Sequence, residues 1–305
     1  MSIPSRLQAQ TRRFALVDGI PFTMPVTCDN SPVLMAAFPI NAERAQAMLP
    51  GNELFALQLL GKGLLVITVI DYLATVIGKY IEFSIGIACT HQTEPAPDFL
   101  PKVLAGQLEI AQFVYDLPVS SEISEKGGKG IWGMPKHQAN LGFDIGGDTV
   151  TVQYEADGHL AMAVQISKPE SFPVPLAMTV SGYSQFRGML FKSYLHFEGR
   201  AGMFVRNAQS AQLVLGDHPL MQPLKELQIE SEPLLTAFIP AAQGALDDHL
   251  ECWFLTYEKP PASTPGNGIG NQPRLKPAVA SPSTNQGKFL TAVTLQEDSR
   301  SLLGE

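Results

Sequence analysis

Hydrophobic residues along this chain are gathered in short apolar runs separated by turn-forming residues, a pattern typical of β-strands. The run Leu64–Ile70 (LLVITVI) is unbroken and rich in β-branched residues, which predicts a strand buried on both faces. A second strand is predicted over Phe83–Cys89, after the turn-like segment Ile77-Gly78-Lys79, and a last one over Leu250–Tyr257. The first half of the chain therefore predicts extended segments with few helices between them.

The middle of the chain predicts a meander of antiparallel strands. Two glycine-containing dipeptides separate the apolar segments, and both are suited to the positive φ angles of tight hairpin turns. The predicted strands are Gly142–Ile145, Thr149–Glu155 and Leu160–Ser167, with turns at Gly146-Gly147 and Asp157-Gly158.

Two short helices are predicted beside the strands. Asn41 is expected to cap a helix that runs through Ala45 to Met48. A second helix is expected after Asp217, in the N-cap region, with Pro219 at an early helical position. Its apolar residues recur at helical spacing, at Leu220, Leu224 and Leu227.

The composition changes abruptly at Lys259. Residues 259–288 contain six prolines together with Gly, Ser and Asn, and no aromatic residue. Such a segment cannot bury enough apolar surface to offset its conformational entropy. We therefore predict an N-terminal arm (1–14), a single folded domain (15–258) and a disordered tail (259–305). The domain lacks alternating strand–helix units and a glycine-rich phosphate loop, which disfavours a doubly wound nucleotide-binding fold.

Composition and charge narrow the cellular setting. Of 305 residues, 45% are hydrophobic and 16% are charged, below the usual share of about a quarter. The net charge of −8 disfavours a nucleic-acid partner, because an acidic surface repels phosphates. The N-terminus lacks the apolar core of a signal peptide, and the longest apolar run is too short to cross a bilayer. We expect a cytoplasmic protein with reduced thiols and no membrane partner.

Two common kinds of catalytic centre find no support in the sequence. No two of the six histidines have the i, i+4 spacing of a helical metal site, and the three cysteines form no C-x-x-C pair. No G-x-S-x-G element occurs, which disfavours a serine hydrolase. We expect neither a metal nor another cofactor.

The segment Gly130–His137 (GIWGMPKH) carries the first candidate for chemistry. It embeds Lys136 among an indole, a methionine, a proline and two glycines. A buried ammonium loses hydration, which favours the neutral amine, and a neutral amine can attack a ketone to form an imine. The alternative is a lysine that reaches solvent from a loop while only its aliphatic stem is covered.

The segment Gly78-Lys79-Tyr80-Ile81-Glu82 carries the second candidate, because it leads directly into the predicted strand Phe83–Cys89. An acidic residue that opens an apolar strand is either exposed at the strand end or turned into a cavity. Taken alone, the exposed position is the simpler interpretation of Glu82.

Together the two segments resemble the acetoacetate decarboxylase family. In that family a G-x-Y-x-E element opens a strand and a W-G-x-P-K element follows about fifty residues later, as in this sequence. The similarity covers about residues 15–258. Further matches lie at Ala36–Pro50, Asp71-Tyr72, Ala211–Leu215, His218-Pro219 and Leu224–Leu227.

The resemblance implies a mainly β (α+β) fold, an antiparallel, cone-like β-barrel flanked by helices, with the active site in the barrel interior. It implies that Lys136 forms a Schiff base with the substrate and that Glu82 lies near it. Acetoacetate decarboxylase is itself the standard example of an enzyme that activates a lysine in this way. The family also implies a homo-oligomer.

The activity implied is decarboxylation of acetoacetate or a related β-keto acid. An imine on Lys136 withdraws electrons from the bond to the carboxylate, carbon dioxide leaves, and the enamine is protonated and hydrolysed. Glu82 is expected to position the substrate or to move protons. The neighbouring side chains expected to contact the substrate are Trp132, Met134, Tyr80 and His137.

Three departures from the family pattern leave the reaction open. His137 replaces a second lysine, no arginine lies between Arg13 and Arg44, and Leu64–Ile70 contains no acidic residue. The missing groups would bind a small, doubly polar substrate, which favours a larger or less polar carbonyl compound. One alternative is therefore aldolase or dehydratase chemistry on an oxo acid with the same lysine. Another is a barrel that binds an apolar carbonyl or lipid ligand without turnover.

Overall fold

The computed structural model describes residues 4–9, 12–91 and 107–257, all within one compact unit of the chain. The tail predicted over residues 259–305 lies outside the described residues and stays a prediction. None of the helices in the described part has the length and apolar character needed to cross a bilayer.

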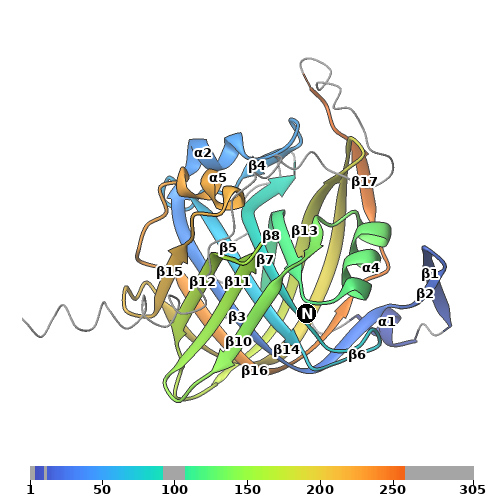
Figure 1. Ribbon diagram of the computed structural model, residues 1–305, viewed down its shortest axis with the longest axis horizontal. Helices are drawn as coiled ribbons and strands as arrows, with labels where there is room; N and C mark the ends of the chain where they lie inside the picture. The colour runs from blue at the N-terminus through green and yellow to red at the C-terminus, as the bar shows by residue number, and fades with distance from the viewer. Residues whose placement is uncertain (1–3, 10–11, 92–106, 258–305) are drawn as a thin grey trace, which may run out of the picture. The chain divides into compact units, whose positions relative to one another are not determined.

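Seven strands close into a barrel (Figure 1). In ring order each strand is hydrogen-bonded to the next, and the last returns to the first. The strands are β3 (Val26–Asn41), β5 (Lys62–Tyr72), β7 (Tyr80–His91), β8 (Gln107–Val119), β13 (Val174–Phe186), β14 (Met189–Val205) and β16 (Leu235–Leu246). The barrel expected from the sequence is thus present.

The barrel is mixed rather than wholly antiparallel. Strands β8 and β13 run parallel, and the short strand β9 (Lys136–Gln138) also pairs parallel to β8. Parallel neighbours need a long crossover connection. Between β8 and β13 the chain supplies one, which contains helix α4 (Glu122–Trp132) and three strands of a second sheet.

The predicted meander forms that second sheet, which crosses the outside of the barrel (Figure 1). Its order is β10-β11-β12-β15, all antiparallel. Its strands are β10 (Asn140–Ile145), β11 (Thr149–Ala156), β12 (His159–Ser167) and β15 (Ala211–Leu215). Asp157 and Gly158 have positive φ as predicted, at 53° and 77°. The same prediction for Gly146-Gly147 is wrong, because neither glycine has a positive φ angle. The turn is present, and the backbone N–H of Gly146 donates to the carbonyl of Thr149 at 2.9 Å.

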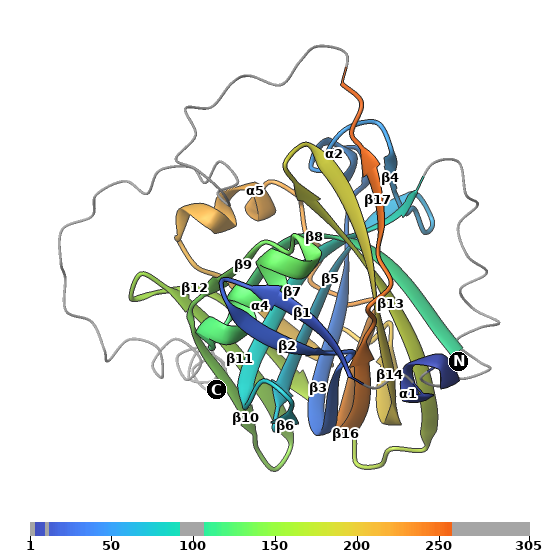
Figure 2. The same cartoon turned by 90° about the vertical axis from the view of Figure 1, so that its right-hand side faces the viewer.

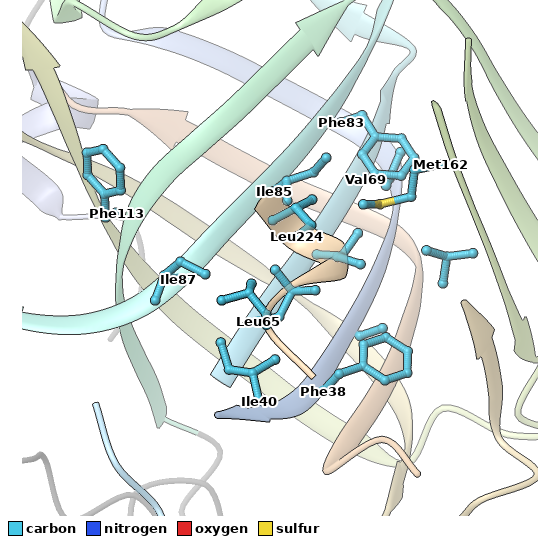
Figure 3. Close-up of a cluster of buried hydrophobic side chains, with 14 of the residues drawn as sticks. Phe38, Ile40, Leu65, Val69, Phe83, Ile85, Ile87, Phe113, Met162 and Leu224 are labelled. Atoms are coloured by element: carbon cyan, nitrogen blue, oxygen red, sulfur yellow. The ribbon is translucent and has the colours of Figure 1, made fainter. Parts of the chain in front are cut away.

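The main hydrophobic core lies between the barrel and the second sheet (Figure 3). Along β5 and β7, alternate residues such as Leu65, Val69, Phe83 and Ile85 pack into this core, where Met162 of the second sheet meets them. The residues that alternate with them on β5 and β7, such as Ile70, Glu82 and Ser84, point into the barrel. Because both faces are covered, the run LLVITVI is buried throughout, as its unbroken apolar pattern predicts.

Two predicted helices are present, with one change of cap. Helix α2 (Ala42–Ala47) begins after Asn41, whose side chain accepts a hydrogen bond from Arg44 N at 3.0 Å, as predicted. In the second case the N-cap is His218 rather than Asp217. Nδ1 of His218 accepts a hydrogen bond from Leu220 N at 3.3 Å, whereas the Asp217 carboxylate accepts from Lys225. The segment forms a 3-10 turn, η1 (Pro219–Met221), followed by α5 (Gln222–Lys225).

The remaining elements are short and lie at the edges of the barrel. The hairpin β1–β2 lies across α4 (Figure 2). These elements are α1 (Ser5–Ala9), β1 (Arg13–Val17), β2 (Ile20–Met24), β4 (Leu54–Ala56), β6 (Ala74–Thr75) and β17 (Glu251–Phe254). The last strand is shorter than the predicted Leu250–Tyr257.

Candidate active site

Helix α4 forms one wall of the site, although its sequence EISEKGGKGIW contains three glycines. Each glycine inside a helix costs about 1 kcal/mol relative to alanine. Local signals offset part of this cost. Ser121 caps the N-terminus, and the Glu–Lys pairs at i, i+4 are Glu122–Lys126 at 2.6 Å and Glu125–Lys129 at 2.5 Å.

The glycines of α4 allow three neighbours to approach its backbone closely. A Cβ at Gly128 would collide with Cδ of Lys136 and lie 2.7 Å from its Cε. A Cβ at Gly127 would lie 2.6 Å from the Phe22 ring, and one at Gly130 would collide with Val17. The helix therefore trades intrinsic stability for close packing, and Gly128 opens the channel through which Lys136 runs.

Lys136 is buried, and its amine faces a carboxylate. The residue begins β9, where it pairs with Leu117 of β8, and it is 5% exposed. Its Nζ lies 2.6 Å from Oε2 of Glu82 and 2.9 Å from Oγ of Ser124. The Tyr80 ring lies beside it, 5.6 Å from Nζ to the ring centroid. The solvent-exposed interpretation of Lys136 is thus wrong.

Glu82 points into the barrel and is 8% exposed, so the exposed interpretation is wrong here too. It lies on β7 between Ile70 of β5 and Val119 of β8. Tyr72 donates to its Oε1 at 3.5 Å, a long hydrogen bond. Tyr72 also stacks on Tyr80, with ring centroids 4.5 Å apart.

The two tyrosines are neutral partners of the ion pair. Burial, and after it the negative charge of Glu82, raises the pKa of Tyr72 and of Tyr80 well above the ordinary value of a phenol. Both hydroxyl groups therefore keep their protons at neutral pH and can donate hydrogen bonds.

A cavity lies beside the Lys136–Glu82 pair. Its volume is about 80 Å³, which is enough for one small organic acid. Tyr80, Trp132 and Met134, three of the four residues expected to contact a substrate, line it. Among the described lining residues, Lys136 carries the only positive charge. Its apolar walls include Val114, Leu117, Val180, Leu195, Phe197 and Leu246.

His137, the fourth expected contact residue, does not line the cavity. Its Nε2 lies 2.8 Å from Oδ1 of Asp116, and Tyr154 donates to Oδ2 of Asp116 at 3.1 Å. Successive residues of a strand point to opposite faces, so His137 lies outside the barrel when Lys136 lies inside. An irregularity in the pairing of β7 and β8, between Ile85 and Gly86, brings Asp116 to the same outer side.

Trp132 is fixed in the cavity wall by two hydrogen bonds, each between a side chain and a backbone carbonyl. Its indole Nε1 donates to the carbonyl of Asp247 at 3.2 Å, and Ser184 donates to the Trp132 carbonyl at 3.0 Å. The Asp247 carboxylate is itself fully buried and accepts from Arg6, from the His249 backbone N–H and from His196. Burial opposes ionisation, but these hydrogen bonds outweigh it and lower the pKa of Asp247.

Several residues of the site were not predicted from the sequence. Ser124 was missed together with helix α4, although the Ser121 cap and the Glu–Lys spacing are signals for that helix. Tyr72 and Ser84 could have been found, because they lie at even spacing with Ile70 and Glu82 on the inward faces of β5 and β7. The described residues contain no group of three or more His, Cys, Asp or Glu side chains placed to hold a metal ion.

Comparison with known proteins gives one family and one fold. Residues 11–186 match the sequence model of the family described as acetoacetate decarboxylase (ADC). Comparison with curated proteins gave no match.

Solved structures with a similar fold include acetoacetate decarboxylase from Legionella pneumophila, with a TM-score of 0.54 and 16% identity over 73% of this chain and 85% of that one. A second acetoacetate decarboxylase has a TM-score of 0.51 and 14% identity, over 77% and 91%. The enduracididine biosynthesis enzyme MppR, complexed with the condensation product of pyruvate and imidazole 4-carboxaldehyde, has a TM-score of 0.50 and 14% identity, over 75% and 88%. At these identities the likeness concerns the fold alone.

Proposed function

Because the chain belongs to the acetoacetate decarboxylase family, we propose that it is a lyase that forms a Schiff base on Lys136 and decarboxylates acetoacetate or a related small β-keto acid. The observation that carries this proposal is the buried amine of Lys136, 2.6 Å from Glu82 and open to a cavity.

The pair supplies both protonation states that imine formation needs. A proton that moves from the Lys136 ammonium to the Glu82 carboxylate leaves a neutral amine and a neutral acid, with no change in net charge. In a site shielded from water, two neutral groups have less charge to solvate than an ion pair. Glu82 is thus the acceptor that frees the amine, and afterwards the acid that can return the proton.

The proposed reaction uses Lys136 as the nucleophile and Glu82 as the group that gives and takes protons. The amine of Lys136 attacks the ketone carbon to give a carbinolamine. Glu82 protonates the departing hydroxyl, so that water leaves and an iminium forms beside the Glu82 carboxylate. The electron pair of the bond to the substrate carboxylate moves toward the iminium, carbon dioxide leaves and an enamine remains. A proton from solvent, relayed by Glu82, adds to carbon, and water hydrolyses the iminium to ketone and free Lys136.

The rest of the site restricts what can react. Ser124 holds the amine of Lys136 in place, and the neutral hydroxyl of Tyr72 contacts the carboxylate of Glu82. The cavity volume favours a substrate of a few carbon atoms. Its apolar walls offer little stabilisation to the carboxylate of a bound keto acid, which favours release of neutral carbon dioxide.

The experiment is an assay of carbon dioxide release with acetoacetate and a small panel of β-keto acids, on the wild type and on Lys136→Ala. The proposal predicts release by the wild type and a rate at the uncatalysed level for Lys136→Ala. A Lys136→Ala variant as active as the wild type would overturn it.

A second candidate function uses the same imine for aldol condensation and dehydration of an oxo acid. One observation favours it, the lack of a second cation among the described cavity residues to hold a substrate carboxylate. The structure of MppR with a condensation product is a precedent on this fold. Incubation with pyruvate and an aldehyde separates the two: a condensation product without release of carbon dioxide supports the second candidate over the first.

We also propose that the protein assembles into a homo-oligomer, as the family resemblance implies. Two large apolar side chains on β1 support this, because Phe14 is 64% and Leu16 is 73% exposed. Light scattering of the wild type and of a Phe14→Ser/Leu16→Ser variant tests it. A monomeric wild type would contradict the proposal.

A further inference from the structure

Gln112 and Ser84 form a second polar group in the barrel interior that the proposed mechanism does not use. Gln112 lies on β8, is 4% exposed and lines the same cavity as Lys136. Its Nε2 donates to Oγ of Ser84 at 3.2 Å, while its Oε1 has no hydrogen-bond partner in the described part of the chain. A buried amide oxygen without a partner is costly, so its position calls for a ligand that supplies one.

The strand opposite is shaped to admit this amide. Gln112 pairs in register with Ala88 of β7, yet its side chain reaches back along the inside of the barrel to Ser84. The residue between is Gly86, and a Cβ there would lie 2.7 Å from Oε1 and 2.9 Å from Cδ of Gln112. The amide of Gln112 therefore occupies the space that a side chain at position 86 would fill.

The amide lies one inward-facing position from the proposed reaction centre. Ser84 follows Glu82 by two residues on the same face of β7, a step of about 6.6 Å along the strand. Lys136 contacts Glu82, and Gln112 contacts Ser84. A molecule held by Lys136 at its carbonyl carbon can thus reach Gln112 with a group a few bonds away.

One neighbouring hydroxyl group already has a partner. The hydroxyl of Ser193 donates to the carbonyl of Gly182 at 3.3 Å, and Gly182 is the register partner of Gln112 on β13. The next inward residue of β8, Val114, is apolar. Among the described residues that line the cavity, only Gln112 has a fully buried side-chain polar atom without a hydrogen-bond partner, which makes it the group best placed to recognise a polar substituent there.

We propose that Gln112 is a specificity-determining residue and that the substrate is an oxo acid with a hydroxyl group a few bonds from the reacting carbonyl. This inference rests on the proposed function, because it assumes a substrate bound to Lys136. A hydroxyl group fits best because it is both a donor and an acceptor. It can donate to Oε1, or accept from the amide N–H if the amide turns over. A second carboxylate fits less well, because the site offers it no charge.

The experiment compares pairs of oxo acids of equal length, one with a hydroxyl and the other with a methyl group at the far end. The readout is the ratio of their kcat/KM values in the wild type, in Gln112→Leu and in Gly86→Ala. The matched control is Gln153→Leu, the same chemical change on the outer face of β11. Gly86→Ala fills the space of the amide and leaves Gln112 itself intact, so it serves if Gln112→Leu fails to fold.

The wild type and Gln153→Leu are expected to prefer the hydroxylated acid by about tenfold or more. Gln112→Leu and Gly86→Ala are expected to reduce that preference to below about threefold. A wild type without preference, or a Gln112→Leu variant that keeps it, would overturn the inference. Borohydride trapping of the same acids separates the two proposals. Adducts on Lys136 with both members of a pair and no preference defeat this inference alone, whereas no adduct with any acid defeats the proposed function.

Discussion

Lys136 and His137 are neighbours in sequence, each is buried, and each faces a carboxylate, but they lie on opposite sides of the barrel wall. Inside, Lys136 Nζ is 2.6 Å from Glu82, and a cavity adjoins the pair. Outside, His137 Nε2 is 2.8 Å from Asp116, which Tyr154 also contacts. The outer pair lies against the packed core between the barrel and the second sheet.

Under the proposed function, the open space beside the inner pair is what makes it reactive, because burial beside a carboxylate is common to both pairs. Both pairs combine a basic group with a carboxylate out of bulk water. The outer groups are enclosed by side chains, so their hydrogen bonds serve to fasten β9 to β8 and to β11. The inner amine lies on the same short strand, β9, but has open space beside it. Reactivity is expected where a buried base meets a void, and rigidity where it meets packing.

Replacing the inner base should have the largest effect. Lys136→Met keeps the length and apolar stem of the side chain and removes the amine, so we expect activity to fall by about a thousandfold or more. Steady-state kinetics with the best substrate of the panel measures this, and circular dichroism checks the fold. Retention of more than a tenth of the activity would rule out Lys136 as the nucleophile.

The same isosteric change should lower activity at the inner carboxylate, Glu82, and stability at the outer one, Asp116. Glu82→Gln removes the proposed proton acceptor and donor, so we expect activity to fall by about a hundredfold or more. Asp116→Asn weakens only a packed hydrogen-bond network, so we expect about 2 kcal/mol lower stability to unfolding and less than a tenfold loss of activity. Kinetics and urea denaturation of both variants measure the contrast. Equal losses of activity would remove the distinction between the inner and outer pairs.

Helix α4 offers a finer test of the inner side. Gly128→Ala places a methyl group where the stem of Lys136 runs, so we expect activity to fall by about tenfold. Gly130→Ala is the matched control, because it adds the same methyl group on the same helix but meets Val17 of β1. Each change also gains about 1 kcal/mol of helix propensity. If Gly130→Ala impaired kcat as much as Gly128→Ala, contact with Lys136 would not be the cause.

A third buried carboxylate, Asp247, should give the smallest effect and a pH dependence of its own. Hydrogen bonds from Arg6, His249 N–H and His196 lower its pKa in the folded state. A lowered pKa stabilises the fold above the ordinary carboxyl pKa of about 4, and this contribution is lost as pH falls through the lowered value. We expect Asp247→Asn to be about 1–2 kcal/mol less stable than the wild type at pH 7. Urea denaturation should show this gap shrinking at pH 3, and a constant gap would contradict the assignment.

Sequence patterns predicted the parts of the fold that depend on local rules. The strand Leu64–Ile70, the Asp157-Gly158 turn and the Asn41 cap each follow from a few adjacent residues, and all three are confirmed. Helix α4 was not predicted from the sequence, because its three glycines disfavour a helix. The reasons for them, Phe22, Lys136 and Val17, belong to other elements. Propensity was overruled there by close packing.

The candidate site was partly predictable for the same reason. Two motifs pointed to Lys136 and Glu82, and the fold brings their side chains together. His137 was expected beside them, although strand alternation after Lys136 already indicates the opposite face. Gln112 could not be found from sequence, because the role proposed for it depends on the missing side chain of Gly86 on another strand and on the register of β7 and β8. Such relations exist only once the barrel has closed.

The central claim, that Lys136 bonds covalently to a carbonyl substrate, is tested most directly by borohydride reduction followed by peptide mass spectrometry. With an oxo acid present, the expected result is an irreversible adduct on the peptide that contains Lys136, with the mass of carbon dioxide missing if decarboxylation came first. The adduct should be absent in Lys136→Met. An unmodified Lys136 after reduction with every acid of the panel, or an adduct on a different lysine, would contradict the account.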